Sequence, residues 1–394
     1  MKRASIRRQK VSKSQQKEKK IPSNDMVWDN IDFEHNYRQM IMAIKTKPFL
    51  ILAGISGTGK SRFTRMLSHK CCTDKFKKIG GDPGNFLLIQ VQADWHDAHN
   101  LLGYKNSKGL YEVTDFILFL VKAWKNVDIP FILCLDEMNL AKVERYFASF
   151  LSIIESRRFE GAKLISDAFI TAENILQYSK KDRTFWSRLC INTYPHLQQH
   201  FANDGIKMPP NLIVIGTMNI DESESISKKV LDRAMTFDMS EIDMYKGLTF
   251  RSNDFQYPKD YLPAHYLLGG MNDGYDAYQL SKEDGDTVIN VLIEIDFILA
   301  NSKFRFGYRT RNEILIYCYF NGLLPGKPDN WLDICIDEMI LIKILPKLEG
   351  KFDRSELLTK LLEITIKYPN SHQKLLEIKA SSLDGGFGYA SFFE

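Results

Sequence analysis

A glycine-rich run near residue 55 has the residue types and spacing of a phosphate-binding loop. Residues 54–61 read GISGTGKS, which fits G-x-x-x-x-G-K-[ST]. Glycines let the backbone curl so that several N–H groups face one anion, and the following helix N-terminus adds its dipole. We expect Lys60 to contact the β- and γ-phosphates of a nucleotide and the Ser61 hydroxyl to bind Mg²⁺. The predicted loop comprises Gly54, Ile55, Ser56, Gly57, Thr58, Gly59, Lys60 and Ser61.

Two carboxylates, Asp136 and Glu137, directly follow the apolar run 131–135. The run predicts a buried strand, and ligands of α/β sheets bind at the carboxyl ends of such strands. We expect Asp136 to hold Mg²⁺ through water and Glu137 to orient and deprotonate an attacking water. The alternative is that the pair only caps the helix that follows.

Asn219 ends another buried run, 212–216, followed by Thr-Met-Asn. A polar side chain here would lie beside the γ-phosphate, between the phosphate loop and the acidic pair. We therefore predict that Asn219 senses the phosphate and positions water. The alternative is a turn-forming asparagine.

Two arginines are candidates for charge stabilisation. The predicted helix 226–234 carries Arg233, and an arginine that reaches a neighbouring subunit's site would neutralise transition-state charge. Its alternative is a surface salt bridge. Arg309 lies at a helix start permitted by Gly307 and could touch the nucleotide from a lid. Its alternative is a solvated arginine.

The elements that must position these residues alternate along the chain. Apolar runs at 49–53, 86–91, 131–135 and 212–216 predict strands, with helical patterns between them, so we expect a mostly parallel sheet flanked by helices. After residue 240 strand signals fade, and 289–299, 311–320, 337–345 and 355–366 predict helices. The predicted organisation is a tail (1–27), an α/β nucleotide-binding domain (28–240) and a smaller helical lid domain (241–394).

One long segment, 159–210, has little pattern and lies between two predicted strands. Long insertions in compact domains are often functional or mobile. Lys180, Lys181 and Arg183 precede Phe185 and Trp186, a combination that suits a nucleic-acid strand. The alternatives are a disordered loop, aromatics packed on the helical domain, or a docking site for a partner.

Charge and composition limit the remaining possibilities. The net charge is +4, but residues 1–20 hold +8, so the rest of the chain is mildly acidic. Such a tail is either disordered or a non-specific phosphate contact. The six cysteines form no C-x-x-C pair, which favours reduced thiols in a cytoplasmic protein. We expect no membrane span and no secretory signal, because no sufficiently long apolar run is present.

Several strings together resemble the McrB branch of the AAA+ proteins. The most specific is LDEMNLAKVERYF at 135–147, and the others are PNL at 210–212, GTMN at 216–219, KVLDRA at 229–234, VQADW at 91–95, LGY at 102–104 and KILPK at 343–347. The resemblance covers residues 28–394 and implies a P-loop AAA+ core with a helical lid.

What the resemblance implies is a nucleotide-driven ring, expected to be a hexamer, that hydrolyses ATP or GTP with Mg²⁺. In that family the ring works with an McrC-type nuclease to restrict foreign or modified DNA. DNA contact would then be non-sequence-specific or made through the partner. The alternative is a MoxR-like AAA+ ATPase that remodels proteins, since both classes share the same catalytic parts.

Overall fold

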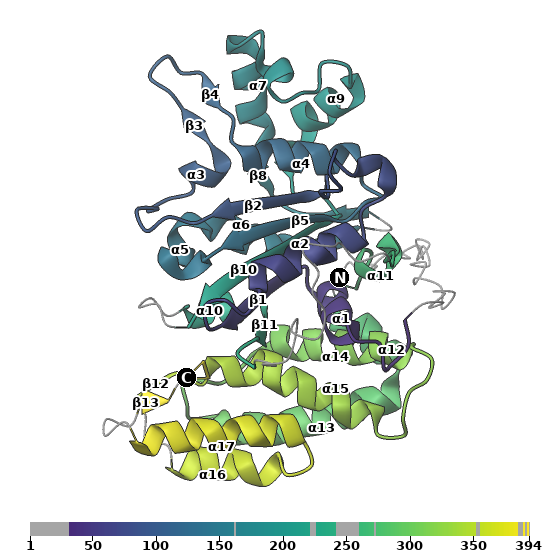
Figure 1. Cartoon of the computed structure of the whole chain (residues 1–394), viewed down its shortest axis with the longest axis vertical. Coiled ribbons are helices and arrows are strands. Elements are labelled where there is room, and N and C mark those ends of the chain that lie inside the picture. Colours follow the sequence, from purple (N-terminus) through teal and green to yellow (C-terminus); the bar gives the residue numbers. More distant parts are fainter. Residues whose placement is uncertain are drawn as a thin grey trace, which may run out of the picture.

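The centre of the protein is a five-stranded parallel sheet (Figure 1). The computed structural model describes residues 31–160, 163–220, 226–241, 260–271, 273–351, 355–384, 389–390 and 392–393. The basic tail predicted at 1–27 lies outside them. The strands, in spatial order, are β11 (Met235–Asp238), β1 (Phe49–Gly54), β10 (Leu212–Asn219), β5 (Phe131–Asp136) and β2 (Phe86–Gln90).

Continuous apolar sequence explains why the inner strands are buried on both faces. Every residue of β1 is buried, as are the first seven residues of β10. Parallel strands need crossover connections, and helices in those connections cover the sheet. The four predicted strands are confirmed. The fifth, β11, pairs with β1 so that Leu50 lies opposite Met235.

Short helices surround this sheet and connect its strands. Some of them, such as α2, pack directly on the strands. They are α1 (Arg38–Thr46), α2 (Lys60–Lys70), η1 (Asp74–Phe76), α3 (His99–Leu102), α4 (Asp115–Lys125), η2 (Met138–Leu140), α5 (Val143–Tyr146), α6 (Ala148–Ser156) and α10 (Lys228–Leu231). A hairpin of β3 (Tyr104–Lys105) and β4 (Tyr111–Glu112) projects from the same part.

The segment predicted as a long insertion is folded over most of its length. It contains β6 (Arg158–Glu160), β7 (Lys163–Ile165), β8 (Ala168–Ile170), α7 (Ala172–Lys181), α8 (Phe185–Arg188), α9 (Pro195–Asp204) and β9 (Ile206–Lys207). Helices α7 and α9 lie at the top of Figure 1, beyond α4 and away from the C-terminal helices. The alternative of a disordered surface loop is therefore wrong.

The C-terminal part is helical, as predicted, and lies below the sheet in Figure 1. Its elements are α11 (Ala264–Leu267), α12 (Gly274–Leu280), α13 (Lys282–Leu299), α14 (Tyr308–Gly322), α15 (Trp331–Met339), η3 (Ile340–Ile344), η4 (Leu345–Lys347), β12 (Gly350–Lys351), α16 (Ser355–Ile364), α17 (Pro369–Asp384) and β13 (Tyr389–Ala390). The α/β core with a helical lid is thus confirmed. No helix in the described ranges is long and apolar enough to span a membrane.

A buried ion pair ties α1 to this helical part. The guanidinium of Arg38 donates to the Glu338 carboxylate of α15, at 3.0 Å for one nitrogen, and to Asn321 Oδ1 of α14 at 2.6 Å. The Tyr317 hydroxyl donates to the same carboxylate at 2.6 Å. Because both charges are paired and hydrogen-bonded, their interactions offset the desolvation cost of burying them. The segment before β1 is therefore anchored to the lid as well as to the sheet.

Candidate nucleotide-binding site

The phosphate loop joins the carboxyl end of β1 to the start of α2. Gly57 and Gly59 both have φ of +85°, a left-handed conformation that glycine adopts without strain. Gly54 packs closely against the backbone of Met239, since a Cβ at residue 54 would lie 2.9 Å from the Met239 carbonyl carbon. Gly59 caps α2 and has no side chain to bond its first N–H groups. The dipole of α2 makes this helix start a favourable position for an anion.

Lys60 lies within this loop. Its ammonium donates to the carbonyl oxygens of Gly54 at 2.8 Å and Ile55 at 2.7 Å. The side chain is buried, whereas Ser56 and Gly57 are exposed. A buried cation therefore lies against an exposed glycine-rich loop, and this combination is typical of sites that bind nucleotide phosphates.

Asp136 ends β5 in contact with two hydroxyl groups. Ser61 Oγ donates to Asp136 Oδ1, and Thr217 Oγ1 donates to the same oxygen at 2.7 Å. The oxygens of Ser61 and Asp136 are hard donors of the kind that Mg²⁺ prefers, so these residues fit the ion. They would hold it, and when bound it would neutralise charge on phosphate oxygens.

Glu137 turns the chain immediately after Asp136. Its φ of +53° is left-handed, which is uncommon for a residue with a side chain. Its backbone N–H donates to Thr217 Oγ1 at 2.9 Å, and its Oε1 accepts from Asn219 Nδ2 at 3.2 Å. Asn219 Nδ2 is therefore within hydrogen-bond distance of the carboxylate predicted to activate water.

Arg233 lies at the other end of β1 from the phosphate loop. It precedes Met235, which pairs with Leu50, whereas Gly54 ends the strand. At about 3.3 Å per residue, the four steps from Leu50 to Gly54 span about 13 Å. Arg233 instead pairs with Glu155 at 2.8 Å and donates to the Lys229 carbonyl at 2.6 Å. The structure thus does not bring Arg233 to the phosphate loop of its own chain.

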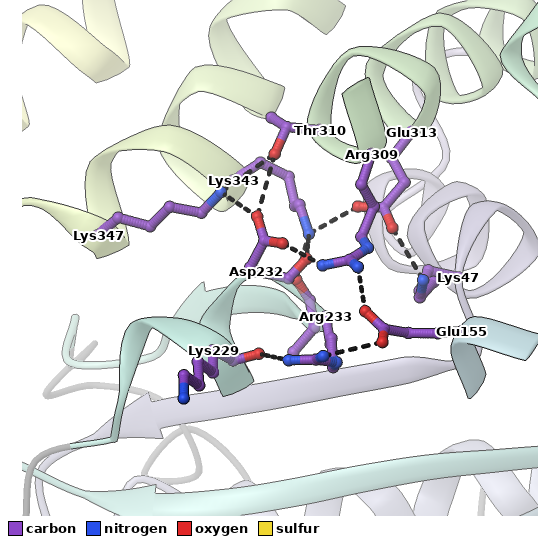
Figure 2. Close-up of polar contacts among 11 residues, drawn as sticks. Lys47, Glu155, Lys229, Asp232, Arg233, Arg309, Thr310, Glu313, Lys343 and Lys347 are labelled. Atoms are coloured by element: carbon purple, nitrogen blue, oxygen red, sulfur yellow. Dashed lines mark hydrogen bonds and ion pairs between the residues drawn. The ribbon is translucent and has the colours of Figure 1, made fainter. Parts of the chain in front are cut away.

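Arg309, at the start of α14, lies beside Arg233 and not beside Lys60. Its guanidinium pairs with both Asp232 and Glu155, and Glu155 also accepts from Arg233 (Figure 2). Glu155 is near the end of α6. In this arrangement Arg309 makes no contact with the loop that it was predicted to assist from the lid.

Two lysines of the lid bind the turn between α10 and β11. Lys347 pairs with Asp232 at 2.7 Å and donates to Thr310 Oγ1 at 3.1 Å. Lys343, which is fully buried, donates to the carbonyls of Asp232 at 3.0 Å and Ala234 at 2.8 Å (Figure 2). The turn contains Arg233, and these bonds attach it to η3 and η4 of the lid.

Nearby cations offset the effect of burial on the pKa values of Asp232 and Glu313. Burial alone would raise the pKa of Asp232, but Lys347, Lys343 and Arg309 hold it well below its usual range. Burial opposes ionisation of Glu313 as well, yet Lys343 at 2.6 Å and Lys47 at 3.0 Å lower its pKa. Both acids therefore stay ionised, because an uncompensated charge here would be costly.

Three residues in these contacts were not predicted from the sequence. Thr217 bridges the Asp136 carboxylate and the Glu137 backbone N–H, Asn139 Nδ2 donates to the Asn219 carbonyl at 3.0 Å, and Glu155 joins the two arginines. Thr217 had a usable signal, because residues two apart on a strand share a face and Asn219 was already a candidate. Glu155 had none, since its partners are distant in sequence.

The basic segment of the insertion differs from the prediction in one respect. Lys180, Lys181 and Arg183 are exposed, as contact with a strand of nucleic acid would require. Phe185 is fully buried, with its ring centroid 5.9 Å from that of Tyr178. The predicted base stacking by Phe185 is therefore wrong, and this ring packs within the insertion rather than on the helical domain.

The fold and the site together define a P-loop nucleotide hydrolase domain of the AAA+ class. Residues 49–235 match the AAA domain of the dynein-related subfamily. Residues 270–387 match a domain of unknown function, DUF8727. No curated protein was found to match the chain. Residues 49–235 therefore have the sequence and the fold of an AAA+ domain, and AAA+ domains in general hydrolyse nucleoside triphosphates.

Proposed function

We propose that the protein is a ring-forming motor that hydrolyses ATP or GTP at sites shared between neighbouring subunits. The observation that carries this proposal is the separation of Arg233 from Lys60. The phosphate loop, Asp136 and Glu137 lie at the carboxyl edge of the sheet, whereas Arg233 follows α10 at the amino end of β1. If Arg233 serves a nucleotide, that nucleotide belongs to another chain, and head-to-tail contacts of this kind form a ring when the rotation between subunits closes.

Each side chain has a distinct task in the proposed reaction. Lys60 and the loop N–H groups bind the phosphates, and Ser61 with Asp136 would hold Mg²⁺. Glu137 takes a proton from the attacking water, which Asn219 helps to orient. Arg233 from the adjacent subunit neutralises charge that develops on the transferred phosphoryl group.

Mixing two inactive variants tests the shared site. Lys60→Ala removes the phosphate contact, and Arg233→Ala removes the arginine given to the neighbour. In a co-assembled one-to-one mixture, about a quarter of the interfaces would combine an intact loop with an intact arginine. We expect activity to return in the mixture but not in either variant alone. Absence of rescue in mixtures shown to co-assemble would exclude the shared site.

We further propose that the ring drives a DNA restriction complex with an McrC-like nuclease. The support is the set of McrB-like strings, and η3 and η4 give one of them a structural role. Lys343 and Lys347 of the KILPK string clamp the Asp232–Ala234 turn that carries Arg233. A string that positions the catalytic arginine is one that a motor of this type would need.

The biochemical test uses ATP and GTP hydrolysis with and without DNA and the adjacent gene's product. A restriction motor predicts that the product is a nuclease, that it binds the ring, and that DNA cleavage requires hydrolysable nucleotide. A MoxR-like remodelling ATPase predicts hydrolysis without nuclease partnership and without nucleotide-dependent DNA cleavage. The second outcome would overturn the restriction role and leave the hydrolase intact.

A further inference from the structure

The Thr217 hydroxyl connects the Asp136 carboxylate to the backbone N–H of Glu137 in the candidate active site. The hydroxyl donates to Asp136 Oδ1 at 2.7 Å and accepts from the Glu137 N–H at 2.9 Å. A hydroxyl has one proton and two lone pairs, so these two bonds fix its orientation. The residue is only 1% exposed, and water cannot readily replace it.

The position of Thr217 follows from sheet register. Gly216 on β10 lies opposite Leu135 on β5, so Thr217 is the next residue toward Asp136. Asn219 is two residues further along the strand and therefore faces the same side. One face of β10 thus presents a hydroxyl to the turn at Asp136 and an amide to the Glu137 carboxylate.

Glu137 needs such support because of its backbone conformation. Consecutive residues of a strand point to opposite faces, so an extended Glu137 would face away from Asp136. Its left-handed φ of +53° breaks the strand at this point. Such conformations persist only where the surroundings hold them. The N–H bond to Thr217 and the side-chain bond to Asn219 hold Glu137 from both ends.

We infer that Thr217 is a positioning residue for nucleotide hydrolysis. It sets the turn that aims the Glu137 carboxylate and shares the Asp136 oxygen with Ser61. It acts through these residues and touches no substrate itself. This inference rests on the proposed hydrolase activity and does not depend on any DNA-directed role.

Replacing the hydroxyl while keeping side-chain size tests the inference. Thr217→Val should lower kcat at least about tenfold, since small misplacements of catalytic groups are costly, and should change KM much less. Thr217→Ser keeps the hydroxyl and should restore most of kcat. If Thr217→Val does not fold, the pair Thr217→Ser and Thr217→Ala, which also differ by a hydroxyl, gives the same comparison.

Thr236 on β11, which is separated from β10 by β1 in the same sheet, provides a matched control. It is equally buried, and its hydroxyl has no hydrogen-bond partner in the described part of the chain. Thr236→Val therefore makes the same chemical change in the same sheet without breaking a bond to the site. We expect its kcat to equal that of the wild type.

A double variant separates positioning from general damage. If Thr217 acts through Glu137, adding Thr217→Val to Glu137→Gln should lower turnover little further. Multiplied losses in the double variant, or wild-type kcat in folded Thr217→Val, would overturn the inference. A wild-type protein without hydrolysis would instead refute the hydrolase proposal, so the two failures are distinguishable.

Discussion

Asp232 and Lys347 form an ion pair of 2.7 Å that joins the turn before β11 to the lid. The two residues are 115 positions apart in the chain. Asp232 also pairs with Arg309, so one carboxylate receives two lid cations. The Asp232 carboxylate therefore links the turn before β11 to both α14 and η4 of the C-terminal part.

Asp232→Asn should weaken this link and destabilise the protein. Breaking a fully buried pair costs about 3–5 kcal/mol, and partial exposure of Asp232 reduces our expectation to roughly 2–4 kcal/mol. The loss in the free energy of unfolding is measured by urea unfolding at neutral pH, followed by circular dichroism. Glu356→Gln removes an exposed pair with Lys360 and serves as a control with little expected change.

Asp232 also predicts how stability depends on pH. Its pKa is lowered in the folded protein, so its contribution is present above the unfolded pKa of about 3.9. That contribution is lost as pH falls further, toward the folded pKa. Asp232→Asn should therefore show a smaller loss of stability than the wild type between about pH 5 and pH 3. If the free energy of unfolding fell equally with pH in the wild type and in Asp232→Asn, the role of this carboxylate would be contradicted.

Arg309 should serve a neighbour's nucleotide if it serves one at all, because it shares Glu155 with Arg233. Arg309→Met mixed with Lys60→Ala should then regain activity, since one subunit supplies the loop and the other supplies both arginines. Arg309→Met mixed with Arg233→Ala should stay inactive. Nucleotide turnover in co-assembled mixtures measures both results.

The opposite pattern would assign Arg309 to its own chain's site. In that case Arg309→Met would be rescued by Arg233→Ala and not by Lys60→Ala. Such a result would require the lid to leave the ion pairs with Asp232 and Glu155 during turnover.

The exposed basic residues of the insertion give a test of DNA contact. Changing Lys180, Lys181 and Arg183 to Glu should weaken DNA binding and reduce its salt dependence, because fewer phosphate contacts release fewer counterions. The measurement is DNA affinity at several salt concentrations, with partner binding assayed in parallel. Partner docking would instead predict lost partner binding with DNA affinity retained. Wild-type behaviour in both assays would leave the segment without either role.

Sequence predicted the central sheet and its catalytic edge because the signals are local. The continuous apolar runs 49–53 and 131–135 indicate buried strands, because a glycine-rich loop follows the first and an acidic pair follows the second. β11 was missed because it is short and contains Thr236 and Asp238, which weaken the apolar pattern.

Residues joined by tertiary packing could not be predicted in the same way. The partners of Arg309 lie 77 and 154 positions away, so its location depends on how the lid docks. Phe185 resembled an exposed stacking aromatic until the fold of the insertion buried it. The left-handed turn at Glu137 had no signal either, since glycine or asparagine usually occupies such positions.

Nucleotide binding and turnover, measured in parallel for the wild type, Glu137→Gln and Lys60→Ala, test the central claim most directly. Glu137→Gln should bind Mg²⁺-nucleotide as the wild type does, with turnover reduced about 100-fold or more, because general-base catalysis contributes that much. Lys60→Ala should lose nucleotide binding. Normal turnover in Glu137→Gln, or undiminished binding in Lys60→Ala, would contradict the account.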